Sequence, residues 1–176
     1  MRPSSLRLIS LWCGLSGAAG LIYEVIWTRQ FAEIVGATAP AMSAVFAVFM
    51  LGLAGGGGMA GRLRLTPRGA LSGYALLQLG IAVTALAAGM ILRVAGMPLA
   101  WWRPESLSLA LGYDLAVAGL VLGMPILLMG ATLPLVVTAA RGWPCPEEAV
   151  ARLYGWNTLG AAVGAGLAGF LLIWQL

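Results

Sequence analysis

The sequence contains no His and no Lys, and only two of its 176 residues are Cys. Without His, a haem ligand, a Ser-His-Asp triad and most zinc sites lack an essential side chain. Cys13 lies in an apolar segment and Cys145 in a short loop between Pro144 and Pro146, so we expect two free thiols. The sequence therefore predicts no cofactor, no metal site and no catalytic residue.

Charge is also scarce. Charged residues make up 9% of the chain and hydrophobic residues 61%, with a mean hydropathy of +0.94. Soluble domains carry about 25% charged residues, which this chain does not approach. Ten Arg against six acidic residues give a net charge of +4, but the arginines form no basic stripe, which excludes a nucleic-acid partner. We predict an all-α, polytopic transmembrane helical bundle that forms one domain over residues 1–176.

Interruptions of the apolar pattern leave five stretches that can cross a bilayer, which takes about 20 helical residues. The predicted spans are 8–28, 40–61, 69–92, 108–140 and 153–176. The first is expected to be a retained helix rather than a signal peptide, because its apolar run continues to Trp27. The fourth contains Pro125 and Pro134, and two interpretations stay open: one long kinked helix, or a re-entrant break near Pro125.

The arginines predict the orientation. With the N-terminus in the cytoplasm, seven arginines lie on the inner side, and Arg29, Arg93 and Arg103 lie on the outer side. Arginine is enriched in cytoplasmic loops, so this distribution favours a cytoplasmic N-terminus and, after five crossings, an external C-terminus. We expect a multi-pass protein of the bacterial inner membrane. The arginine-rich loop 62–68 is expected to contact membrane lipid headgroups.

Small residues recur at four-residue spacing, which predicts close helix packing. The predicted packing residues are Gly57, Gly61, Gly160, Gly164 and Gly169. The last three lie on the final span, where we expect a partner to cover them, either another membrane subunit or a second copy of this chain. Small-residue faces gain little from contact with lipid.

Charged groups inside a membrane are default candidates for function. Glu24 and Asp114 suggest a pair that binds a cation or carries a proton near the outer side. The alternative is that both acids are structural and pair with Arg29, Arg93 or Arg103. Arg29 can also pair with Glu33, four residues later, if that segment is helical. Asn157 is the remaining polar candidate, and we expect an interhelical hydrogen bond or a helix cap rather than a ligand contact.

Three stretches, residues 16–29, 128–134 and 153–161, resemble the membrane region of bacterial spermidine synthase-like proteins. In that family a multi-helix region precedes an aminopropyltransferase-like domain. Glu24, Arg29, Pro134 and Asn157 lie in the matching motifs. The resemblance implies a membrane scaffold. No catalytic residue carries over, because the soluble α/β sequence of that domain is absent from these residues.

We therefore expect a non-catalytic integral membrane scaffold or accessory subunit. One alternative is a transporter or channel for a small cation or a polyamine, with Glu24 and Asp114 as ligands. Five helices without a visible inverted repeat count against that alternative. Another is a subunit of a larger respiratory or photosynthetic membrane complex.

Overall fold

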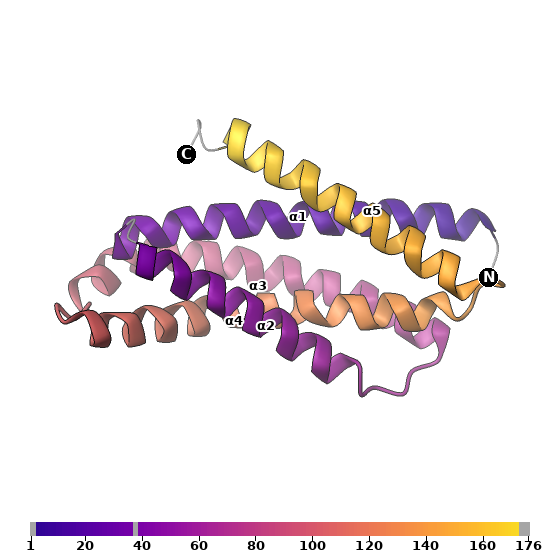
Figure 1. Cartoon of the computed structure of the whole chain (residues 1–176), viewed down its shortest axis with the longest axis horizontal. Helices are drawn as coiled ribbons and strands as arrows, with labels where there is room; N and C mark the ends of the chain where they lie inside the picture. Colours follow the sequence, from indigo (N-terminus) through magenta and orange to yellow (C-terminus); the bar gives the residue numbers. More distant parts are fainter. Residues whose placement is uncertain (1–2, 37–38, 173–176) are drawn as a thin grey trace.

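The computed structural model describes residues 3–36 and 39–172 of the chain. All regular secondary structure in this part is helical, and it contains no strand, as the sequence predicts. Its five α-helices, labelled in Figure 1, are α1 (Pro3–Val35), α2 (Ala39–Ala60), α3 (Pro67–Trp101), α4 (Leu107–Ala140) and α5 (Pro146–Leu167). A π-helical turn, η1 (Ala168–Leu172), follows α5.

Within the described residues, four segments are long and apolar enough to cross a membrane. These are Ser5–Val35, Met42–Ala60, Pro67–Trp101 and Leu107–Ala140. The α5 helix carries Glu147 and Glu148 in its first turn and also contains Arg152. Its first half is therefore too polar for α5 to be counted among the membrane spans. Residues 173–176 of the predicted fifth span lie outside the described residues. The structure therefore shows a bundle suited to a membrane, and the fifth crossing stays a prediction.

Three helices extend beyond the segments predicted from the apolar pattern. The α1 helix starts at Pro3 and continues past Arg29 to Val35, rather than covering 8–28. The α3 helix continues past Arg93 and through Pro98 to Trp101. The α5 helix starts at Pro146 rather than at residue 153. Glu147 and Glu148, which precede the predicted span 153–176, form the first turn of α5, where acidic side chains are favoured by the helix dipole. The prediction was wrong at these ends because a charge marks where a chain leaves lipid, not where a helix stops.

Backbone chemistry sets other helix ends. Gly36 has a φ of 89°, a left-handed conformation that terminates α1. The Thr66 side chain caps α3 by accepting a hydrogen bond from the Gly69 backbone N–H at 3.1 Å. The α4 helix runs without interruption through Pro125 and Pro134. One long helix is therefore confirmed for this region, and a re-entrant break is excluded.

The helices alternate in direction along the bundle. In Figure 1, α1, α3 and α5 start at the end that carries the N-terminus, and α2 and α4 run the opposite way. The main contacts join α1 to α5, α2 to α4, and α3 to α4. Two of these contacts, α1–α5 and α2–α4, thus join parallel helices, which cross obliquely.

Glycine contacts explain why the two parallel pairs approach so closely. A Cβ atom at Gly160 of α5 would collide with the Gly14 carbonyl of α1, and one at Gly164 would collide with Ala18. In the other pair, a Cβ at Gly56 of α2 would collide with the Leu127 carbonyl of α4. Such contact between backbones is the packing mode that small residues permit in membranes.

The structure corrects the role expected for the other small residues. Gly160 and Gly164 face α1 of the same chain, so the face that we expected a partner to cover is covered within the molecule. A Cβ at Gly57 would make only an ordinary contact with Gly130, and one at Gly61 would meet only its own helix. No atom lies within 4 Å of a Cβ built at Gly169. A small-residue stripe indicates a close neighbour without identifying it.

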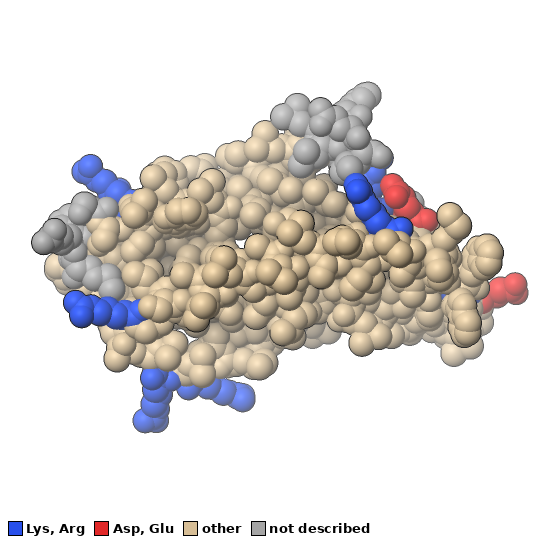
Figure 2. Space-filling model, turned by 180° about the vertical axis from the view of Figure 1, so that it is seen from behind, with Lys and Arg blue, Asp and Glu red and all other residues tan. Residues whose placement is uncertain are grey.

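The core consists of two apolar clusters. One lies toward the end where α3 stops and includes Trp27, Phe31, Leu122 and Ile126. The other lies toward the N-terminal end of the bundle and includes Leu153. The space-filling view in Figure 2 shows a broad middle without charged side chains, and the charges lie toward the two ends.

Candidate functional site

Asp114, the most deeply placed acidic candidate, is locked into an ion pair. Its side chain is 0% exposed. The Arg103 guanidinium donates from Nε to Oδ1 at 3.0 Å and from Nη2 to Oδ2 at 2.9 Å. This two-point geometry is the strongest form of Arg–carboxylate pairing, and it raises the pKa of Arg103. Among the partners proposed for Asp114, the structure selects Arg103.

Glu24 lies in a different place, in a pocket of about 430 Å³ between α1 and α2. The pocket is mainly apolar, with Phe46 and Phe49 among its walls, and Thr28 and Ser43 add hydroxyl groups. Asp114 is not part of it. The two acids proposed as a cation-binding pair therefore line no common pocket among those found in the described residues.

Arg29 and Glu33 form the ion pair expected from their spacing on a helix. The Arg29 Nε and Glu33 Oε1 atoms are 3.5 Å apart, and 34% and 65% of the two side chains are exposed. Exposed pairs of this type contribute about 0.3–0.5 kcal/mol, so this contact is a local stabiliser at most.

Asn157 lies in the middle of α5 rather than at its start, and it lines a cavity at the centre of the bundle. The cavity has a volume of about 170 Å³. All five α-helices contribute to its wall. Its polar side chains are Ser16 from α1, Gln78 from α3, Thr132 from α4 and Asn157 from α5. This central cavity is the candidate functional site.

One hydrogen bond spans the wall of the central cavity. Gln78 Nε2 donates to Ser16 Oγ at 2.5 Å and joins α3 to α1. Thr132 donates to the Met129 carbonyl of its own helix at 2.7 Å. No described residue hydrogen-bonds to the Asn157 amide. A polar cavity with unused amide atoms and more than enough room for one water is the kind that holds ordered water.

The central cavity also gathers residues from three separate stretches of the sequence, 16–29, 128–134 and 153–161. Ser16 and Gly20 belong to the first, Met129 and Thr132 to the second, and Asn157 to the third. These stretches lie far apart in the sequence, and the parallel α1–α5 packing and the inward face of α4 bring them together. The convergence indicates that these motifs build one internal structure.

The chemistry of the central cavity is that of neutral hydrogen-bonding groups. No charged side chain lines it. The described residues contain no group of three His, Cys, Asp or Glu that could hold a metal ion. Hydroxyl and amide groups in this arrangement can bind water or a small neutral polar molecule and can link helices.

Sequence reasoning missed Gln78 and Thr132. Gln78 carried a usable signal, because it is an amide in the middle of a long apolar run, where a polar side chain needs a partner. Thr132 carried little signal, since threonine often bonds to its own helix, as it does here.

No known family model matches this chain, and no curated protein or solved structure is significantly similar to it.

Proposed function

We propose that residues 1–176 form a non-catalytic integral membrane scaffold of the kind suggested by their resemblance to spermidine synthase-like membrane regions. The observation that carries the proposal is the state of Asp114. This carboxylate is fully buried and held at two points by Arg103, so it joins the α3–α4 connection to α4 instead of facing a cavity. The acid most suited to ligand chemistry thus supports the fold.

The transport alternative has less support from the geometry. A polyamine carries several ammonium groups, and transferring them from water requires acidic partners or a strongly polar path. Glu24 and Asp114 do not share a pocket, and the central cavity has no charged wall. The proposed role is therefore to hold helices together and present a surface, not to move a cation.

The proposal includes the bacterial inner membrane and a cytoplasmic N-terminus. Arg62, Arg64 and Arg141 lie together around one pocket at the end of the bundle where α2 and α4 finish. On the face in Figure 2, arginine side chains are visible at both ends, with more of them on the left, and the visible acids are on the right. Glu147 and Glu148 begin α5 at the same end, but the positive-inside rule counts basic residues and gives acids little weight, so this arginine cluster is the distribution that the rule associates with the cytoplasm.

The proposal includes a partner, which is either another membrane subunit or a second copy of this chain. A larger respiratory or photosynthetic complex is one assembly in which such a subunit could act. Such a partner would not dock on Gly160 and Gly164, because α1 already occupies that face.

An activity assay tests the proposal. The purified chain in nanodiscs is incubated with putrescine and decarboxylated S-adenosylmethionine, and spermidine is measured by mass spectrometry. We expect no product above empty nanodiscs. Turnover that depends on the chain would contradict the non-catalytic assignment.

A further inference from the structure

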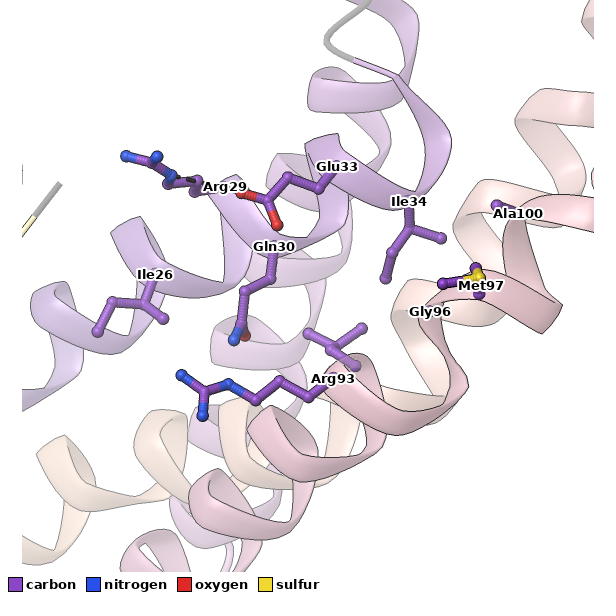
Figure 3. Close-up of a pocket in the computed structure, with 10 residues that line it drawn as sticks. Ile26, Arg29, Gln30, Glu33, Ile34, Arg93, Gly96, Met97 and Ala100 are labelled. Carbon is purple, nitrogen blue, oxygen red and sulfur yellow. Dashed lines mark ion pairs between the residues drawn. The ribbon is translucent and has the colours of Figure 1, made fainter. Parts of the chain in front are cut away.

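A separate polar pocket lies in the groove between α1 and α3 (Figure 3). It has a volume of about 370 Å³, and among the described residues only these two helices line it. Its polar side chains are Arg29, Gln30 and Glu33 from α1 and Arg93 from α3. Beyond them Ile34 packs on Gly96, where a Cβ would lie 3.1 Å from Ile34 Cγ1, and this contact closes one side of the groove.

Hydrogen-bond donors face each other across this groove. Figure 3 shows the Gln30 amide and the Arg93 guanidinium directed toward one another. Gln30 Oε1 is buried with no hydrogen-bond partner in the described chain. The amide acceptor is thus turned into the protein, which leaves the Nε2 donor for the pocket. Arginine has donors only. The acceptors in the groove are the Glu33 carboxylate and the buried Gln30 oxygen, and no described hydrogen bond or ion pair joins either of them to Arg93.

The charges of the groove specify an anionic acceptor. Glu33 is already paired with Arg29 at the rim, 3.5 Å away, and 65% of its side chain is exposed. No described residue forms an ion pair with Arg93. The groove thus keeps the positive charge of Arg93. A guanidinium beside an amide N–H matches the oxygens of a phosphate group.

The distance along α3 places Arg93 at the depth of the lipid headgroups. Arg93 follows Arg68 by 25 residues, or about 37 Å along a helix at 1.5 Å per residue. This length lies between the hydrocarbon thickness of about 30 Å and the full bilayer thickness of about 40–45 Å. Between Arg93 and the middle of α3, on the hydrocarbon side of Arg93, Val83, Leu86 and Met90 are 68%, 66% and 67% exposed. Such an apolar surface suits contact with acyl chains.

We propose that the α1–α3 groove binds the phosphodiester group of a phospholipid in the adjacent leaflet. Arg93 and the Gln30 Nε2 donate to the phosphate oxygens, and the acyl chains lie against the apolar face of α3. Free phosphate offers the same acceptor, but it would not use that apolar face. The site is independent of the scaffold role and requires only that the bundle sits in a membrane.

Native mass spectrometry tests this site. The detergent-purified chain is mixed with equal amounts of phosphatidylethanolamine and of diacylglycerol with the same acyl chains, which lacks the phosphate. We expect the wild type to retain the phospholipid preferentially and Arg93→Gln to lower that preference about tenfold, the effect of losing one charge-assisted hydrogen bond. Arg152→Gln, which changes an exposed arginine of α5, should keep the preference.

Further variants and a competitor complete the test. Gln30→Leu should also lower the preference. Because leucine favours a helix, this variant provides the test if Arg93→Gln does not fold. Millimolar inorganic phosphate should leave the bound lipid in place. Displacement of the lipid by phosphate would overturn the lipid assignment in favour of a free anion. Equal retention of the two lipids, or a preference unchanged in both variants, would overturn the site itself.

Discussion

The Arg103 guanidinium and the Asp114 carboxylate meet through two hydrogen bonds of 3.0 and 2.9 Å, across the turn that links α3 to α4. Arg103 lies outside both helices and remains 25% exposed, whereas Asp114 is fully buried within α4. The pair therefore brings a connecting segment down onto the helix that follows it. The pair thereby fixes the α3–α4 connection at the end of the bundle where Glu33 and Arg93 also lie.

Breaking this pair from one side should destabilise the bundle. Arg103→Met leaves the buried carboxylate without a partner, which costs on the order of 3 kcal/mol for a buried ion pair. Glu33→Gln is the matched control, because it breaks an exposed pair worth about 0.3–0.5 kcal/mol. Unfolding by sodium dodecyl sulfate in mixed micelles measures both. Equal losses of stability in the two variants would refute the structural role of Asp114.

The α1–α5 contact should tolerate no added methyl group at Gly160. Gly160→Ala places a Cβ against the Gly14 carbonyl, and we expect a loss of about 1–3 kcal/mol from overpacking. Gly166→Ala on the same helix has nothing within 4 Å, so it should be neutral or slightly stabilising because alanine favours a helix. Thermal unfolding in detergent compares the two. If Gly166→Ala is as harmful as Gly160→Ala, the close contact is not real.

The central cavity should contain water. Met129 lines it, whereas Met90 is 67% exposed on the lipid-facing surface of α3. Hydroxyl radicals generated by X-rays label side chains next to water, so in nanodiscs we expect oxidation of Met129 and protection of Met90. Mass spectrometry of the digested protein reads out both methionines. Protection of Met129 to the level of Met90 would indicate a dry cavity.

The two native cysteines allow the orientation to be tested with little mutagenesis. Cys145 is exposed in the connection before α5, and Cys13 is buried. With a cytoplasmic N-terminus, a membrane-impermeant maleimide should label Cys145 only after the cells are opened. Cys145→Ser should abolish that labelling, and adding Ser106→Cys to it should restore labelling from outside. Labelling of Cys145 in intact spheroplasts would reverse the proposed orientation.

The sequence was sufficient to predict the helical bundle, because long apolar runs in lipid have few alternatives to a helix. It could not place the ends of α3 and α5, since Arg93 and Glu147 mark polarity rather than backbone conformation. The sequence also allowed the prediction that Asp114 requires a positively charged partner. Which of three arginines supplies it depends on how the α3–α4 connection folds back, and this is a tertiary property.

The central cavity was beyond sequence reasoning for the same reason. Ser16, Gln78 and Asn157 belong to three helices, and no local pattern shows that their faces converge. Gly160 is an intermediate case. Its spacing from Gly164 predicted a close helix neighbour, but only the packed structure shows that this neighbour is α1 of the same chain.

The central claim is that the polar groups of this bundle hold helices together and do not conduct a cation. Uptake of radiolabelled putrescine into proteoliposomes tests it most directly, with empty liposomes and the Glu24→Gln variant measured in parallel. The account predicts that wild type, variant and empty liposomes accumulate the same small amount of label. Saturable uptake by the wild type that Glu24→Gln abolishes would contradict it.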